Sequence, residues 1–407
     1  MERQILHIDA NSFYASCECA QNPELLDKPV AVVGDEKKRH GIVLTANYIA
    51  KLGYGVSTAE TVYSAMKKCP SLVLLKPNMP LYKEYSEKMR RIISEYTDLV
   101  ESFGIDENFA DVTNCGRFFG TGEEIAKKIS DRIKDELKIT VSIGVSFNKA
   151  FAKLGSDMKK PDGITVITKE NFKEKVWPLD AGKLLYVGKK TLEKLRNRGI
   201  YTIGDIANTD LYILKSIFGK SGEMLYNFAN GYDREPVMRF DEEREVKSIS
   251  NSITASRDLE TIDEVKLVLY NIADNVAFRA RCDDVKGNIV SIYVKDEDFN
   301  QTVRQTKLDF YTDTSREIAN EAISLFLKNY KWDKKVRLLG IALSGFSEKN
   351  DTVQLSVFDD TKKRERIRKL EQAQDKLKEK YGYSCIKRGV LCTDEKLTGG
   401  RFLAQNN

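Results

Sequence analysis

The spacing of apolar residues over residues 3–147 predicts alternating strands and helices. The apolar run 3–8 ends at Asp9, as a buried strand would. Thr121 with Glu124 gives the capping-box pattern that precedes a helix. In chain order we expect a strand over 3–8, a helix over 81–100, a hairpin over 101–113, a helix after Thr121 and an alternating strand over 139–147. This order is that of a split βαβ, or ferredoxin-like, sheet, with residues 12–76 inserted after its first strand.

A second set of elements in the same order is expected nearer the C-terminus. It comprises strands over 246–254, 288–295, 301–310 and 336–344 and helices over 262–281 and 315–329. No sequence identity links the two sets, so the similarity is one of topology alone. The stretch between them, 168–235, has a helical pattern, and one further helix is expected over 361–380. The fold class is therefore α+β, with two split-βαβ sheets and a helical segment between them.

Composition narrows the class of protein. A chain of 407 residues, 41 % of them apolar, is long enough for about three globular domains. It has no run of about 18 apolar residues and no secretory signal, so we expect no membrane span and a cytoplasmic location. Seven cysteines without a Cys-x-x-Cys pair, and only two histidines, favour reduced thiols over a structural zinc site. The net charge is only +5, but 168–235 and 351–407 each carry an excess of basic side chains.

Three carboxylates are expected to meet on the first sheet. Asp9 ends the first strand, and Asp106 and Glu107 lie in the hairpin that neighbours it in a split βαβ fold. Clustered carboxylates repel one another unless cations neutralise them, and all-oxygen ligands suit Mg²⁺. Asp106 and Glu107 can share a site only at a turn or bulge, because successive strand residues face opposite ways. Spacing alone leaves two alternatives open, namely solvated turn residues and a nucleotide cyclase site.

Several motifs resemble those of one enzyme family. The segment Asp9-Ala10-Asn11-Ser12-Phe13-Tyr14-Ala15-Ser16-Cys17-Glu18 resembles the opening motif of the Y-family DNA polymerases, and Phe103-Gly104-Ile105-Asp106-Glu107 resembles their second acidic motif. Three further motifs fit as well: Thr45-Ala46-Asn47-Tyr48, Asn148-Lys149-x-Phe151-Ala152-Lys153 and Asp157-Met158-Lys159-Lys160-Pro161-x-Gly163. The resemblance covers roughly residues 1–390 and is strongest to the bacterial DinB class of DNA polymerase IV-like enzymes.

The resemblance implies a template-directed nucleotidyltransferase of four domains. It implies a ferredoxin-like palm, small fingers, an all-helical helix-hairpin-helix thumb and a split-βαβ little finger. The implied boundaries are 1–11 and 77–167 for the palm, 12–76 for the fingers, 168–236 for the thumb, 237–245 for a linker, 246–349 for the little finger and 350–407 for a C-terminal tail.

The resemblance also implies a catalytic site. Asp9, Asp106 and Glu107 would hold two Mg²⁺ ions, together with the backbone carbonyl of Ala10. Tyr14 would be a steric gate, because its ring occupies the space that a ribose 2′-hydroxyl needs. The implied nucleotide contacts are Phe13, Tyr14, Thr45, Tyr48, Lys51 and Lys160. Lys51 departs from the Arg common in the family, so a point charge replaces a forked contact.

Two hairpins and one short peptide imply macromolecular partners. Tyr186-Val187-Gly188-Lys189-Lys190 resembles the hairpin of a helix-hairpin-helix unit, where backbone N–H groups meet a DNA phosphate, and Phe218-Gly219-Lys220-Ser221-Gly222 is a weaker second copy. The implied DNA contacts are Gly188, Lys189, Lys190, Gly219 and Lys220. The peptide Gln354-Leu355-Ser356-Val357-Phe358 resembles the docking peptide of bacterial polymerases for the sliding clamp, although its alternation also suits an ordinary strand.

The expected function is that of an Mg²⁺-dependent, low-fidelity DNA-directed DNA polymerase for translesion synthesis in DNA repair. Its partners would be primer-template DNA, deoxynucleoside triphosphates and the sliding clamp, and it would act as a monomer. No exonuclease-like acidic set is evident in the sequence, which fits absent proofreading. The alternative is a catalytically inactive, clamp-tethered DNA-binding protein, which the intact Asp9, Asp106 and Glu107 argue against.

Overall fold

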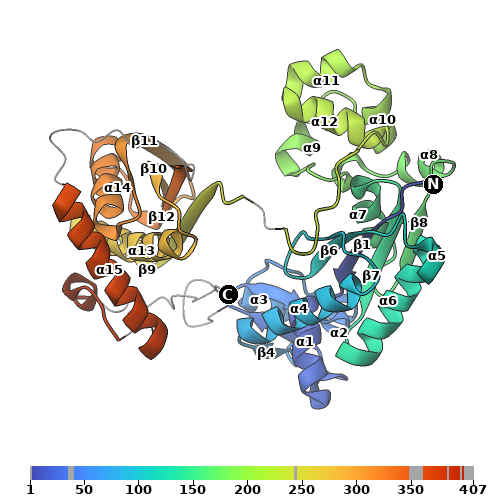
Figure 1. The fold of residues 1–407 in the computed structure, drawn as a ribbon, viewed down its shortest axis with the longest axis horizontal. Helices are drawn as coiled ribbons and strands as arrows, with labels where there is room; N and C mark the ends of the chain where they lie inside the picture. The colour runs from blue at the N-terminus through green and yellow to red at the C-terminus, as the bar shows by residue number, and fades with distance from the viewer. Residues whose placement is uncertain are drawn as a thin grey trace. The chain divides into compact units, whose positions relative to one another are not determined.

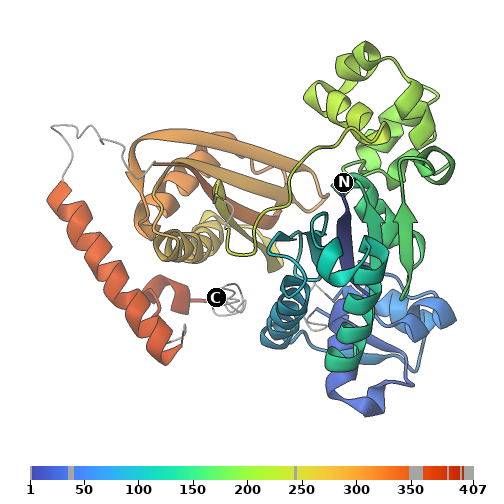
Figure 2. The same cartoon turned by 45° about the vertical axis from the view of Figure 1, so that its right-hand side comes forward.

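The chain folds into two compact units (Figures 1 and 2). The computed structural model describes residues 2–34, 41–242, 245–347, 361–382, 385–394 and 397. Described residues up to 242 form the first unit, and those from 245 onward form the second. No helix in these ranges is both long and apolar enough to cross a membrane.

The first unit is built on a five-stranded sheet in the order β5-β6-β1-β7-β8. Its strands are β1 (Ile5–Ala10), β5 (Val100–Ser102), β6 (Glu107–Asp111), β7 (Val141–Ser146) and β8 (Ile164–Ile167). Strand β1 is buried throughout and pairs antiparallel with β6 and β7, which is the ferredoxin-like arrangement expected for the palm. One face packs on α4 (Met79–Ser94) and α6 (Gly122–Leu137), and α7 (Lys149–Met158) packs on β1 and β7 from the other. The expected capping box of Thr121 and Glu124 starts α6.

The segments before and after this sheet form a small second sheet and a group of helices. The sheet β3-β2-β4 follows α1 in the inserted segment. The elements of this segment are α1 (Phe13–Gln21), η1 (Pro23–Leu25), β2 (Val30–Val33), β3 (Val43–Ala46), α2 (Tyr48–Tyr54), α3 (Val62–Lys68) and β4 (Val73–Leu75). The remaining helices of the unit are α5 (Gly116–Phe119), α8 (Phe172–Val176), η2 (Ala181–Lys183), α9 (Lys189–Arg196), α10 (Ile203–Asn208), α11 (Leu211–Phe218) and α12 (Lys220–Ala229).

The first residues of the predicted linker, 237–245, pack on the five-stranded sheet instead of running free. Val237 is buried in a cluster with Ile5 and Phe109. The ring of Phe240 lies 4.2 Å from the guanidinium carbon of Arg90. Apolar burial and a cation–π contact therefore hold this stretch against the sheet and α4.

The second unit has a four-stranded sheet in the order β11-β10-β12-β9. Its elements are β9 (Ser248–Leu259), α13 (Ile262–Cys282), β10 (Gly287–Asp296), β11 (Gln301–Thr312), α14 (Ser315–Asn329) and β12 (Val336–Phe346). Their order along the chain is the one expected, and each βαβ unit is again split by an antiparallel strand. The central strands of this sheet, β10 and β12, are the second and fourth strands of the unit along the chain. In the five-stranded sheet the corresponding positions are held by β1 and β6, which are the first and third strands of its split βαβ set. The two sheets are thus related in element order but not in strand order.

A C-terminal helix, α15 (Thr361–Tyr381), docks on the second unit through buried ion pairs, and η3 (Gly389–Cys392) follows it. Arg281 of α13 lies 2.7 Å from Glu371 and 2.6 Å from Asp375. Arg388 also reaches Glu371, at 3.0 Å. Leu370 is 59 % exposed, so charged residues rather than an apolar stripe face the unit.

Candidate active site

A cavity of about 330 Å³ in the first unit brings together the predicted site residues. Strand β1 ends at this cavity and α1 begins there. Its lining includes the three carboxylates, Ala10 and all six predicted nucleotide contacts: Asp9, Asp106, Glu107, Phe13, Tyr14, Thr45, Tyr48, Lys51 and Lys160. Residues from the first strand, the insertion and the hairpin therefore meet in one place, as the split-βαβ topology predicts.

The two acidic motifs meet on adjacent central strands. Asp9 of β1 pairs directly opposite Glu107 of β6. Asp106 lies in the turn just before β6, where its carbonyl accepts a hydrogen bond from the N–H of Ala10 at 3.0 Å. This turn allows the adjacent Asp106 and Glu107 to line the same cavity.

Lysines already neutralise part of this acidic group. The Nζ of Lys153 lies 3.1 Å from Asp9 and 2.8 Å from Glu107, and the Nζ of Lys160 lies 2.7 Å from Asp9. Within the described ranges, no three or more His, Cys, Asp and Glu side chains are already placed to hold a metal ion. The donor set is nevertheless the all-oxygen set that Mg²⁺ prefers, so its chemistry fits that ion.

The electrostatic environment gives the carboxylates different proton affinities. Burial, together with the negative charges of Asp9 and Glu107, raises the pKa of Asp106 to about 6. Burial also raises the pKa of Asp9, although Lys160 and Lys153 oppose it. Burial opposes ionisation of Glu107 too, but its contacts with His7 and Lys153 hold its pKa below the usual range. For Asp106, burial and the charges of its two neighbours thus outweigh the opposing charge of Lys153.

His7 and Lys153 are site residues that the sequence analysis did not assign. His7 is fully buried on β1, with Nδ1 2.8 Å from Oγ of Ser156 and Nε2 3.5 Å from Oε2 of Glu107. Burial lowers its pKa, so the ring is neutral at physiological pH. Two signals were available: His7 lies two residues before Asp9, hence on the same face of the strand, and Lys153 ends one of the quoted motifs.

The cavity also has the aromatic and cationic groups expected for a nucleotide. The ring of Tyr14 stacks on Tyr82, with centroids 4.3 Å apart and planes at 14°, so its position is well fixed. Lys51 donates to Oγ of Ser12 at 2.9 Å and lies 5.2 Å from the ring centroid of Tyr48. Ser12 has a left-handed φ of 49°, a conformation that non-glycine residues rarely adopt outside functional turns.

The two predicted DNA-binding hairpins each start a helix. Gly188 is the N-cap of α9 and Gly219 is the N-cap of α12. Lys189, Lys190 and Lys220 are exposed. A helix N-terminus with exposed lysines in its first turn is an arrangement that can bind a phosphate. The predicted clamp peptide, 354–358, lies outside the described residues.

Comparisons with known proteins show the family to which the chain belongs. The impB/mucB/samB family matches residues 8–157, its C-terminal domain matches 246–357, and the DNA polymerase-iota thumb domain matches 184–233. The chain is 48 % identical over 397 residues to a DNA polymerase IV of Acetivibrio thermocellus, covering 98 % of this chain and 99 % of that protein. It is 41 % identical over 400 residues to DNA polymerase IV 1 of Bacillus subtilis, covering 97 % and 94 % respectively. The chain belongs to the DNA polymerase IV group of the Y family.

The similarity extends to the fold of this Y-family translesion DNA polymerase. The Y-family DNA polymerase chimera Dbh-Dpo4(243-245)-Dbh superimposes with a TM-score of 0.74 at 26 % identity, covering 84 % of this chain and 98 % of the chimera. The five-stranded sheet is thus the palm, the helical segment the thumb and the four-stranded sheet the little finger. Y-family polymerases generally use a divalent metal, and a DNA polymerase acts on template DNA and deoxynucleoside triphosphates.

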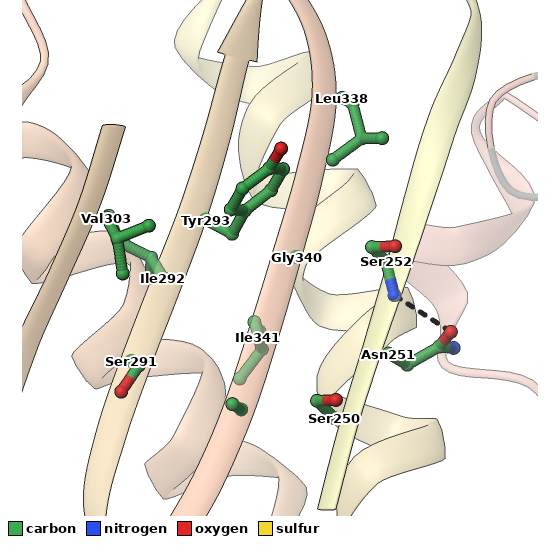
Figure 3. Close-up of a pocket in the computed structure, with 11 residues that line it drawn as sticks. Ser250, Asn251, Ser252, Ser291, Ile292, Tyr293, Val303, Leu338, Gly340 and Ile341 are labelled. Carbon is green, nitrogen blue, oxygen red and sulfur yellow. Dashed lines mark hydrogen bonds between the residues drawn. The ribbon is translucent and has the colours of Figure 1, made fainter. Parts of the chain in front are cut away.

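A second concave surface of this polymerase lies on the little finger (Figure 3). It has a volume of about 570 Å³ on the sheet face opposite α13 and α14. Ser250, Ser252 and Ser291 line it with Tyr293 and Gly340. Its lining contains no charged side chain. Small neutral residues of this kind let another molecule approach the sheet backbone closely.

Proposed function

We propose that the palm cavity is the nucleotidyl-transfer site and that Asp9, Asp106 and Glu107, with the carbonyl of Ala10, hold two Mg²⁺ ions there. The observation that carries this is the pairing of Asp9 with Glu107 beside the Asp106 turn, in the cavity that the nucleotide residues also line. When bound, such ions supply activation of the primer 3′-hydroxyl and stabilisation of the leaving pyrophosphate. The chain's own task is to hold the primer end and the triphosphate in line beside these carboxylates.

The other residues of the cavity would hold and select the nucleotide. Lys51 and Lys160 would neutralise the charge that develops on pyrophosphate, and Thr45 and Tyr48 would add hydroxyl donors. Tyr14, held by its stack on Tyr82, would exclude a 2′-hydroxyl by overlap. Phe13 is buried beneath Tyr14, with ring centroids 5.8 Å apart, and would support the gate.

Contacts outside the palm would be independent of base identity. The hairpins at Gly188 and Gly219 would bind backbone phosphates through helix N-termini. The neutral little-finger groove would lie along the DNA backbone and would likewise make no base-specific contacts. The proposed boundaries are those given above for palm, fingers, thumb and little finger, with the linker partly packed on the palm. The enzyme would act as a monomer in the bacterial cytoplasm and without proofreading, in keeping with a sequence in which no exonuclease-like acidic set is evident.

Primer extension on a defined lesion-bearing template tests this proposal. Extension should require primer, template and Mg²⁺ and should be abolished in Asp106→Ala but retained in Asp131→Ala, which removes an exposed carboxylate of α6. Normal extension by Asp106→Ala would contradict the site assignment. Activity without primer or template would indicate a cyclase, and wild-type inactivity would indicate a DNA-binding protein only.

Clamp docking is tested separately. Deleting residues 354–358 should abolish stimulation by the sliding clamp while leaving clamp-free extension unchanged, because Leu355, Val357 and Phe358 would be the apolar anchors. Stimulation that persists after the deletion would place the docking segment elsewhere.

A further inference from the structure

Lys153 lies at the centre of the carboxylate group, with its side chain only 15 % exposed. Its Nζ lies 3.1 Å from Oδ2 of Asp9 and 2.8 Å from Oε1 of Glu107. One ammonium group thus bridges two of the three carboxylates that the proposed function assigns to metal ions. A divalent ion that binds both carboxylates must displace this ammonium, because like charges at such short range repel strongly.

A fourth carboxylate lies within reach of the same ammonium group. Asp157 follows Lys153 by one turn of α7, and its Oδ2 is 3.6 Å from the Nζ of Lys153. Its other oxygen, Oδ1, is 2.8 Å from the Nζ of Lys160. The flexible four-carbon stem of a lysine lets Nζ turn from the Asp9–Glu107 pair to Asp157 while the backbone stays in place.

We propose that Lys153 is an internal cation that competes with divalent ions for Asp9 and Glu107 and yields to them by turning to Asp157. This inference rests on the proposed function. Lys153 is then a positioning residue. Without a metal ion, its ammonium group holds the carboxylates of Asp9 and Glu107 together and neutralises part of their charge. When a metal ion binds, the ammonium group moves to Asp157. Lys160 shares Asp157, so a triphosphate that draws Lys160 away frees Asp157 for Lys153. Nucleotide binding and metal loading are therefore coupled.

Binding of Mn²⁺ to the full chain, without DNA or nucleotide, measures this competition through the electron paramagnetic resonance signal of free Mn²⁺. Lys153→Gln should raise Mn²⁺ affinity about 10-fold, because the competing charge is gone. Asp157→Asn should lower it about 3-fold, because Lys153 loses its alternative partner. Asp157→Asn should cause no such loss of Mn²⁺ affinity when combined with Lys153→Gln, because the ammonium group that Asp157 would receive is then absent.

Lys51→Gln is the matched control. It removes a positive charge from the same cavity, but Lys51 donates to Ser12 at 2.9 Å. It should raise Mn²⁺ affinity by less than about 3-fold, as a general field effect would. An equal rise in Lys51→Gln and Lys153→Gln, or none in Lys153→Gln, would overturn the proposal. The proposal would also be overturned if Asp157→Asn lowered Mn²⁺ affinity as much in the Lys153→Gln background as in wild type.

Asp106→Ala separates this inference from the proposed function. If Asp106→Ala leaves Mn²⁺ affinity unchanged in wild type and in the Lys153 and Asp157 variants, the proposed metal site itself is contradicted. Binding that depends on Asp106 but not on Lys153 overturns only the role of the lysine. Circular dichroism checks each fold. If Lys153→Gln folds poorly, Lys153→Arg replaces it in the test. The rigid guanidinium of Arg should turn less readily from Asp9 and Glu107 to Asp157, so this variant should have a lower Mn²⁺ affinity than wild type. An unchanged affinity would contradict the proposal.

Discussion

The palm and the little finger build sheets from the same order of elements and use them differently. In the palm, the central strands β1 and β6 carry Asp9 and Glu107 directly opposite each other. In the little finger, the central strands β10 and β12 place Tyr293 opposite Gly340. The palm carboxylates are covered by α7, which supplies Lys153, while the little-finger groove is lined by neutral residues. Clustered carboxylates need cations beside them, whereas a neutral groove can stay open.

The comparison shows that topology positions a site without defining its chemistry. Both sheets split each βαβ unit, but the palm cavity is lined by carboxylates with lysines beside them, whereas the little-finger groove is lined by neutral residues. Burial of an acidic group is tolerated only where cations or hydrogen bonds compensate it. The four predictions below test this division of roles.

Removing a central-strand side chain should have its largest effect in the palm. Asp9→Ala should lower the rate of primer extension at least about 10³-fold, roughly 4 kcal/mol of transition-state stabilisation, because it deletes a proposed metal ligand. Ser291→Ala, on the equivalent little-finger surface, should change the rate by less than about 3-fold, since it removes only one hydroxyl donor. Single-turnover extension measures both, and similar losses in the two variants would contradict the division.

The sugar selectivity of the palm should depend on one stacked ring. Tyr14→Ala should raise ribonucleotide incorporation relative to deoxyribonucleotide about 10- to 100-fold, because the ring that overlaps a 2′-hydroxyl is gone. Competing the two nucleotides in one extension reaction gives the ratio directly. Tyr63→Ala, which removes an exposed ring of α3, is the control and should leave the ratio unchanged. An unaltered ratio in Tyr14→Ala would remove its gate role.

Repulsion in the palm should appear as a pH dependence of stability. The folded chain keeps a proton on Asp106 up to about pH 6, whereas an unfolded aspartate loses it near pH 4. Wild type therefore loses stability as pH rises through this window. Asp106→Asn does not titrate, so in EDTA its unfolding free energy should exceed that of wild type by about 1–2 kcal/mol at pH 8 and by much less at pH 5. Thermal melting at both pH values tests this, and a constant difference would contradict it.

A new charge in the open groove should have the smallest effect. Ser291→Glu should weaken DNA binding about 3- to 10-fold, because a carboxylate in the groove repels phosphates. Gln372→Glu adds the same charge on the exposed side of α15 and should weaken binding less. Fluorescence anisotropy at one fixed salt concentration compares them. Equal losses would show that the groove is not the contact surface.

Local patterns predicted most elements of the fold. The helix expected over 315–329 is α14, residue for residue. The helix expected over 81–100 ends earlier, at Ser94, because Tyr96 is buried in the turn that leads to β5. Strand β9 runs on to Leu259, five residues beyond the range expected. The order of the strands in the little-finger sheet could not be predicted from the sequence, because alternation of apolar and polar residues shows that a strand is half-buried but not which strand it pairs with.

The catalytic site was predicted in part. Topology and motif together placed Asp9, Asp106 and Glu107 in one cavity, where the structure also has them; their roles stay predictions. His7 and Lys153 were missed because their contacts with Glu107 of β6 come from two other elements, β1 and α7. No periodicity along one element records such a contact. Residue spacing identifies which face a side chain occupies, while its charged partner on another element is set by packing.

The ion pairs that hold α15 make its attachment to the second unit depend strongly on one side chain. Arg281 pairs with both Glu371 and Asp375, so a neutral residue in its place would remove a compensating charge from two buried carboxylates at once. Removing one partner of a buried ion pair costs about 3–5 kcal/mol, so Arg281 decides whether α15 stays docked on α13.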